Sequence, residues 1–418
     1  MLSSGAGNQG ERMAVPPGAM VPGLGDSEGP RAGMWSRRRH LLLRGGLDRA
    51  GAAYGILLAL AAVDSVGYSV IGPVLPTLAH ATHASPLVAG AVVAGFPFGM
   101  LFGFVAAGSS VRRFGTRPTL LGALLVVTGG TVAFIGSDST AGYLAARAAM
   151  GLGSGGLWLG ITFSTLERWP GQEYRCMSRI YAAYSAGALV GPALGALGGV
   201  RTPFVAYLIL VVAVSVPAAL MPTSPTPREF SADRAELRRP GFWVAAVAIM
   251  LAILGTGLVD GALPLHLSVH LSQAAIGGTF AALGIVVALS SAAAGHVKPA
   301  LASAIGAVLL VGGIELVGAT DVVATWLPAL VAIGVGIGIS QTGATGLLLA
   351  AVPTERIVSA MVVWSQMGMV GYLVGPLAGG GLGETLGYRA LGIAPGALAG
   401  LLAAAALVAR RRGIEPSR

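Results

Sequence analysis

Long apolar runs alternate with short polar segments along most of this chain. Each run is close to the roughly 20 residues that an α-helix needs to cross the hydrocarbon core of a bilayer. Helices suit that setting because they satisfy their own backbone hydrogen bonds where no water is present. The pattern predicts an all-α membrane protein with twelve transmembrane helices, at residues 52–79, 86–108, 118–136, 141–165, 177–199, 202–221, 241–265, 273–294, 299–318, 326–350, 357–380 and 387–409.

The polar segments divide the chain into five parts. Residues 1–50 are rich in Gly, Pro and Arg, and no apolar core followed by a cleavage site of small residues marks them as a signal peptide. We expect 1–50 to be a disordered cytoplasmic leader, 51–221 an N-terminal six-helix bundle, 222–240 a cytoplasmic central loop, 241–409 a C-terminal six-helix bundle and 410–418 a cytoplasmic tail.

Composition and charge agree with a membrane protein. Hydrophobic residues make up 54% of the chain and charged residues 10%, against roughly 25% charged in a soluble domain. The net charge of +9 does not indicate nucleic acid, because the charges lie between apolar runs. All Lys and Arg residues except Arg147, Arg201 and Arg389 fall on one side of the predicted helix map. The positive-inside rule therefore places both termini in the cytoplasm of a multi-pass protein of the cell membrane.

An internal repeat relates the two predicted bundles. The sequence SAGALVGPALGALGG recurs as MVGYLVGPLAGGGLG, so that Gly187, Gly191 and Pro192 correspond to Gly371, Gly375 and Pro376. The glycine-rich GLGSGG near residue 151 likewise corresponds to GVGIGIS near residue 334 in the second repeat. Two pseudo-symmetric six-helix bundles are typical of secondary transporters, which work by alternating access around a site at the bundle interface.

Asp64 lies near the middle of the first predicted helix. An ionised carboxylate there costs about 2.5 to 3.5 kcal/mol on insertion scales. A water-filled cavity, a cationic substrate or protonation could offset that cost, and a carboxylate that changes protonation state could couple transport to protons. The alternative is a misplaced helix end that leaves Asp64 at the membrane interface. Gly67, Gly72, Pro73 and Pro76 interrupt the same helix, as in a helix that lines a cavity or packs loosely against lipid.

Two further charged residues are candidates for proton coupling. Arg147 is the one Lys or Arg away from the ends of a predicted span, and it needs a buried acceptor: Asp64, a helix C-terminus or cavity water. The alternative is that Arg147 snorkels to the membrane surface. Asp260 lies toward the outer end of the seventh predicted helix, with His266 and His270 beyond it. This cluster could admit protons, or it could simply occupy a solvated loop.

Aromatic and small residues complete the candidate set. Aromatic side chains can line a cavity for flat or cationic compounds, or merely fill space between helices. The aromatic candidates are Tyr68, Phe96, Phe98, Trp158, Tyr181, Tyr184 and Trp364. Gly187, Gly191 and Gly195 lie on one helix face that Pro192 bends, where a neighbour could pack tightly. The single cysteine, Cys176, excludes an internal disulfide and any multi-cysteine metal site.

Several of these stretches resemble the major facilitator superfamily, and in particular its twelve-helix drug:proton antiporter-1 family. GSSVRRFGTRPTLL resembles the G-x-x-x-D-R-x-G-R-R gating loop, matched at Gly108, Arg113, Gly115 and Arg117. Arg112 stands where the family carries an acid, so the usual gating charge pair is not expected. LAARAAMGLGSGG resembles the helix 4 motif whose arginine, here Arg147, is associated with proton transfer. GALVGPALG resembles the helix 5 antiporter motif, and DSVGYSVIGPVLPTLA matches the helix 1 pattern at Asp64, Pro73 and Pro76.

The resemblance implies a secondary transporter that exports a small amphipathic drug or metabolite in exchange for protons. Uptake of a sugar or other polar nutrient by symport remains an alternative, as does a non-transporting membrane sensor or scaffold. No G-x-x-x-x-G-K-[ST] loop surrounds the single lysine, Lys298, so ATP-driven pumping and enzyme activity are not expected. We expect a monomer whose partners are a small-molecule substrate, protons and membrane lipid, with no nucleic acid, cofactor or metal.

Overall fold

The computed structural model describes residues 51–169, 172–221, 237–320, 323–352 and 357–388. Residues 51–69 are helical and continue, after a turn at Val70, into α2 (Ile71–Thr82). The helices that follow are α3 (Pro86–Phe114), α4 (Thr116–Gly136), α5 (Thr140–Arg168), α6 (Glu173–Gly195) and α7 (Thr202–Leu220). We call residues 51–220 the first half. The second half contains α9 (Pro240–Leu267), α10 (Gln273–Ala294), α11 (Pro299–Ala319), α12 (Val323–Ala351) and α13 (Ile357–Thr385).

Eleven of the twelve predicted helices coincide with helical residues in the described part of the chain. The twelfth, predicted at 387–409, lies almost wholly outside the described residues. The predicted leader, most of the predicted central loop and the predicted tail also lie outside them.

Several predicted boundaries were wrong by about one to two helical turns: the helices predicted at 86–108 and 357–380 continue to Phe114 and Thr385, and the helix predicted at 177–199 begins at Glu173. The helix predicted at 177–199 ends at Gly195, because Gly198 and Gly199 adopt φ values of 90° and 71°, which end a right-handed helix.

Nine helices in the described part of the chain are long and apolar enough to cross a membrane. They include the continuous stretch Gly51–Thr82, with 32 residues. The helices α5 and α6 fall outside that set although α5 has 29 residues and α6 has 23. These two helices carry Arg147 and the Gly187 motif, and polar and small residues make their sequences less apolar than those of the other helices.

The internal repeat reappears as a repeated contact. In the first half, the Ala62 carbonyl lies so close to Gly187 of α6 that no side chain would fit there. In the second half, the Met250 carbonyl of α9 lies equally close to Gly371 of α13. Further along, Gly191 faces Val66 as Gly375 faces Leu254, and Gly195 faces Val70 as Gly379 faces Leu258. Both halves therefore use a glycine face to bring their fifth helix against their first.

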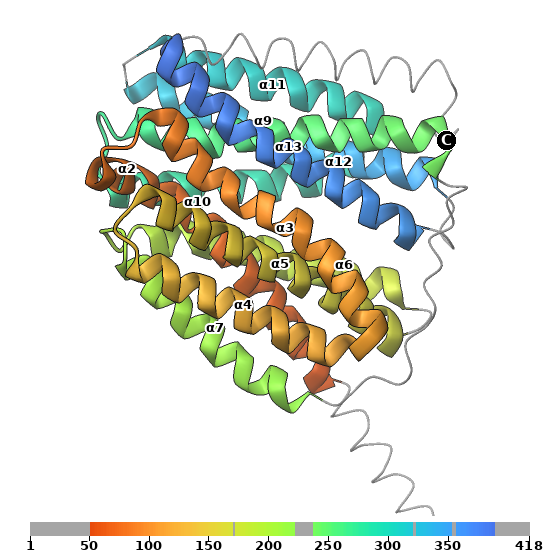
Figure 1. Ribbon diagram of the computed structural model, residues 1–418. Coiled ribbons are helices and arrows are strands. Elements are labelled where there is room, and N and C mark those ends of the chain that lie inside the picture. Colours follow the sequence, from red (N-terminus) through yellow and green to blue (C-terminus); the bar gives the residue numbers. More distant parts are fainter. Residues whose placement is uncertain (1–50, 170–171, 222–236, 321–322, 353–356, 389–418) are drawn as a thin grey trace, which may run out of the picture. The chain divides into compact units, whose positions relative to one another are not determined.

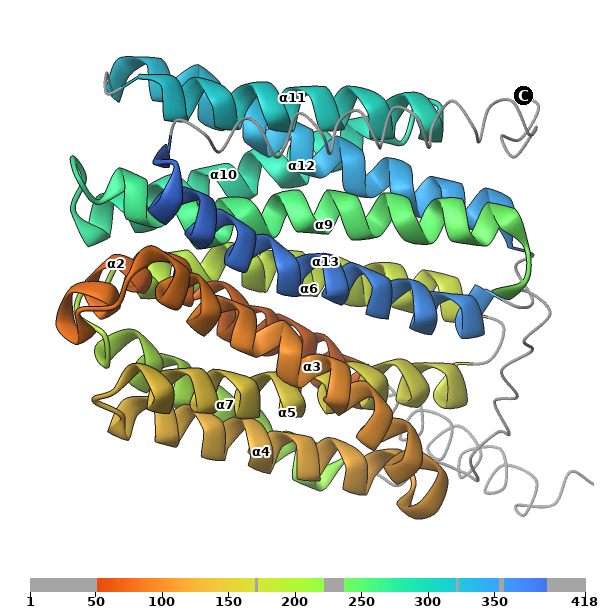
Figure 2. The ribbon, with the colours of Figure 1, turned by 45° about the horizontal axis from the view of Figure 1, so that its top comes forward.

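The two halves meet along two seams, α3 against α13 and α6 against α10. The described helix ends at Arg112, Arg113, Arg117, Arg168 and Arg175 form the arginine-rich end of the bundle, and the opposite end is arginine-poor. Seam contacts such as that of Gly90 with Pro376 and that of Gly380 with Pro86 lie toward the arginine-poor end. From there α3 and α13 diverge toward the arginine-rich end (Figures 1 and 2).

Candidate functional site

Asp64 lies inside the first half and is 2% exposed. Its Oδ2 accepts a hydrogen bond of 3.0 Å from the Ser154 hydroxyl of α5. Its Oδ1 has no hydrogen-bond partner among the described residues. Burying a carboxylate is costly unless it is paired or fully hydrogen-bonded. One neutral hydroxyl leaves that cost largely unmet.

Arg147 is fully buried on α5, and it extends toward the leading helix rather than to the membrane surface. Its Nη1 donates to the Gly67 carbonyl at 2.8 Å and its Nη2 to the Tyr68 carbonyl at 3.4 Å. The guanidinium carbon also lies 4.5 Å from the centre of the Phe96 ring. These contacts partly compensate for burying the cation, through two carbonyls and a π face, while the Nε has no hydrogen-bond partner among the described residues.

The break in the leading helix explains why those carbonyls receive the guanidinium. Gly67 and Tyr68 lie in the last turn before Val70, where the regular helix is interrupted. Carbonyls at a helix end carry partial negative charge. Of the three acceptors expected from the sequence for Arg147, the structure favours a helix C-terminus, and no described contact joins Arg147 to Asp64.

Asp260 is partly buried on α9, and Tyr372 of α13 donates a hydrogen bond of 2.8 Å to its Oδ2. The ring of Tyr372 lies 4.9 Å from that of Tyr68, which in turn lies 5.9 Å from the ring of Phe96. A continuous line of side chains thus runs from Asp260 in the second half to Arg147 in the first. Sequence reasoning missed Tyr372, although it stands within the repeat motif MVGYLVGP.

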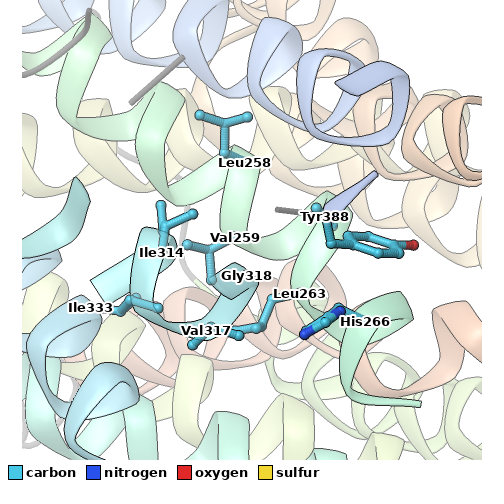
Figure 3. A pocket seen from close by; sticks show the side chains of 10 residues that line it. Leu258, Val259, Leu263, His266, Ile314, Val317, Gly318, Ile333 and Tyr388 are labelled. Atoms are coloured by element: carbon cyan, nitrogen blue, oxygen red, sulfur yellow. The ribbon is translucent and has the colours of Figure 1, made fainter. Parts of the chain in front are cut away.

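The two histidines beyond Asp260 face elsewhere. The His266 ring lies 5.5 Å from that of Trp326 and 5.0 Å from that of Tyr388, and the His270 ring also meets Trp326. Figure 3 shows His266 and Tyr388 at one side of a small apolar pocket, opposite Ile314 and Ile333. The structure therefore does not gather Asp260 and the histidines into one cluster.

A second cavity, of about 40 Å³, lies between the halves. Its lining residues are Phe104, Trp158, Leu159, Thr162, Leu166, Met177 and Tyr181 from the first half, with Met361, Val362 and Ser365 of α13. None of these described side chains is charged, and their polar groups are the hydroxyls of Thr162, Tyr181 and Ser365 and the indole nitrogen of Trp158. The described lining of this cavity is therefore mostly apolar and offers few hydrogen-bond partners.

The aromatic candidates fall into separate places. Trp158 contacts both Tyr181 and Tyr184, with ring centres 5.1 and 5.3 Å apart, at the cavity between the halves. Tyr68 and Phe96 belong instead to the line that reaches Arg147. Trp364 is buried within the second half, where its indole donates to the Ala245 carbonyl. Phe98 is 48% exposed on α3 and packs against Phe102.

The gating motif is mostly helical rather than a loop, because α3 continues through Arg112 and Arg113. Gly115 makes the turn with a φ of 87°, a conformation that favours glycine. Arg117, the second residue of α4, donates to the Ala219 carbonyl near the C-terminus of α7. Arg112 is exposed.

Comparison with protein families gives one broad match. The family model of the Major Facilitator Superfamily matches residues 57–367. The multidrug efflux protein YfmO of Bacillus subtilis (strain 168) is 25% identical over 345 residues, which cover 77% of this chain and 84% of YfmO.

Solved structures share the fold at low sequence identity. A bacterial homologue of the human lysosomal transporter Spinster, in an inward-facing and unoccupied conformation, matches with a TM-score of 0.73 and 13% identity, over 88% of this chain and 99% of that one. The human organic anion transporter MFSD10 (TETRAN) matches with a TM-score of 0.63 and 16% identity, over 85% and 99%. A D-xylose–proton symporter matches with a TM-score of 0.71 and 14% identity, over 85% and 96%.

Proposed function

This chain belongs to the Major Facilitator Superfamily, and we propose that it exports small amphipathic compounds in exchange for protons. It is a membrane transporter by family; the direction of transport and the coupling ion are the proposal. Export agrees with the efflux activity named for YfmO, to which this chain is 25% identical.

The observation that carries proton coupling is the buried Asp64 carboxylate, whose Oδ1 lacks a described partner. A proton there would neutralise the charge, and its release would restore an acceptor-only carboxylate. Arg147 does not compete for this role, because its two hydrogen bonds go to backbone carbonyls. The carboxylate is thus available to alternate between two protonation states.

The cavity between the halves supports an amphipathic substrate. Its described lining offers aromatic rings, methionines and three hydroxyls, from Thr162, Tyr181 and Ser365. A sugar site needs many hydrogen bonds, because each buried hydroxyl left unpaired costs about 1 to 3 kcal/mol. The likeness to the D-xylose–proton symporter is a likeness of fold alone, and the cavity chemistry favours export of an apolar compound over sugar uptake.

In an alternating-access cycle, the end at which the two halves are joined tells which side of the membrane the transporter faces. If both termini are cytoplasmic and the protein lies in the cell membrane, as the arginine distribution suggests, the arginine-poor end is the outer end. The halves are joined there, as expected for an inward-facing state, the conformation named for the Spinster homologue. Exchange would be driven by the proton gradient, since one charge crossing about 100 mV yields about 2.3 kcal/mol.

The test is proton movement in energised inside-out vesicles, followed with a pH-sensitive dye as lipophilic candidate compounds are added. Antiport predicts dequenching in the wild type and at least a tenfold weaker signal in Asp64→Asn. Asp138→Asn is the matched control, because Asp138 is an exposed carboxylate at the arginine-poor end. Uptake of a labelled sugar with co-transported protons, and no exchange of any lipophilic compound, would instead establish the symport alternative.

A further inference from the structure

Tyr372 connects the second half of the transporter to the first. It is 1% exposed on α13, with its hydroxyl on Asp260 and its ring against Tyr68. Close packing fixes its place: a side chain added to Gly257 of α9 would meet Pro376, Gly375 and the Tyr372 ring. The phenol therefore has little freedom to leave the Asp260 carboxylate.

Among the described residues, two phenols interact with the Asp260 carboxyl group. Tyr372 comes from α13 and Tyr68 from the leading helix. Arg147 acts on the same two phenols from the far side. From α12, Gln341 reaches α9 through Thr256, one turn before Asp260, and carries no charge. The hydrogen bond from Tyr372 is therefore well placed to influence how Asp260 binds a proton.

The chemistry of the pair depends on protonation. An ionised carboxylate can only accept, so the Tyr372 hydroxyl donates to it in a charge-assisted hydrogen bond. A protonated Asp260 can itself donate to the phenol oxygen, and the phenol hydrogen must then point elsewhere. The protonated carboxyl can also still accept through its carbonyl oxygen, so the strength of this hydrogen bond follows the state of the carboxylate, next to the ring contact between the halves.

We propose that Tyr372 is a positioning residue that stabilises the ionised form of Asp260 and so sets the pH at which this second carboxylate takes up a proton. The inference extends the proposed proton coupling, which rests on Asp64, to a group in the other half. Proton binding by Asp260 would then change its hydrogen bond with Tyr372, whose ring contacts the first half.

Infrared titration of the purified full-length protein in lipid tests this without any transported compound. The carboxylic acid band of Asp260 is identified as the band that Asp260→Asn removes. Tyr372→Phe keeps the ring and deletes the hydroxyl, so the ionised form loses a hydrogen bond. We expect the midpoint of the Asp260 band to move up by about one pH unit. Tyr143→Phe is the control, because Tyr143 is a buried tyrosine that packs on Phe134.

Two results would overturn the inference. One is a Tyr372→Phe midpoint equal to that of the wild type, and the other is an infrared spectrum in which Asp260→Asn removes no carboxylic acid band at any pH. Thermal unfolding of Tyr372→Phe verifies the fold, and the double variant with Asp260→Asn should lack the same carboxylic acid band as Asp260→Asn alone. A shifted midpoint without proton exchange in vesicles would refute antiport and leave the role of Tyr372 standing.

Discussion

The Nε2 of Gln273 donates to the Gly195 carbonyl at 2.8 Å, across the boundary between the halves. The same nitrogen lies 3.0 Å from the Gly199 carbonyl, and the Oε1 of Gln273 accepts from Thr77 at 2.7 Å. One side chain at the start of α10 thus satisfies the exposed C-terminus of α6 and also holds α2. At the other seam, Glu384 near the end of α13 accepts from the Leu87 nitrogen at the start of α3. Each seam is closed by a side chain of the second half that caps a helix end of the first.

Gln273→Ala should weaken this closure and increase the population opened at the arginine-poor end by roughly tenfold, since it removes up to three hydrogen bonds. Spin labels at His83→Cys and Val269→Cys, both exposed positions at that end, would report the opening as a longer distance in a Cys176→Ser background.

Gln341→Ala is the matched control for that experiment, because Gln341 bonds to Thr256 within the second half. An unchanged distance distribution in Gln273→Ala would show that the hydrogen bonds do not hold the two halves together.

Asp64→Asn should leave the protein folded while abolishing proton coupling. Removing one member of a buried ion pair typically costs about 3 to 5 kcal/mol, but Arg147 bonds to the Gly67 and Tyr68 carbonyls instead of Asp64. We therefore expect a melting temperature within a few degrees of the wild type in detergent. A large loss of thermal stability would indicate that the two charges do depend on each other.

Gly187→Ala and Gly371→Ala should each destabilise the fold by about 1 to 3 kcal/mol, because the added methyl group would collide with a backbone carbonyl of the neighbouring helix. Gly122→Ala serves as the control, since nothing lies within 4 Å of a methyl group there. Thermal unfolding of the three variants measures the difference. Equal stability of all three would mean that the helix pairs relax more easily than their contacts suggest.

Ser365→Trp should reduce export of lipophilic compounds at least tenfold by filling the cavity between the halves, where Ser365 faces Trp158 and Tyr181 among the lining residues. Val374→Trp places the same ring on an exposed position of the same helix and should leave export near the wild-type rate. Vesicle uptake at matched expression compares them. Full activity of Ser365→Trp would place the substrate path elsewhere.

Local properties of the sequence were enough to predict most of the fold. Apolar runs of membrane-spanning length and short polar segments depend on nothing beyond the chain itself, so helix positions followed from them. The glycine faces around Gly187 and Gly371 were also readable, because helical periodicity alone puts their members on one side. Helix ends were less certain, as Gly195 shows, since a turn depends on single φ values.

Partners across helices were decided by the tertiary structure. From the sequence, Arg147 could have bonded to Asp64, and Asp260 could have joined His266. Small rotations of neighbouring helices decide such pairs, and close glycine contacts fix those rotations here. The glycine contacts between the first and fifth helices occur in both halves, whereas Asp64, Arg147 and the Asp260–Tyr372 pair each occur once. Sequence periodicity specifies a repeated framework, but only packing in three dimensions determines which charged groups within it meet.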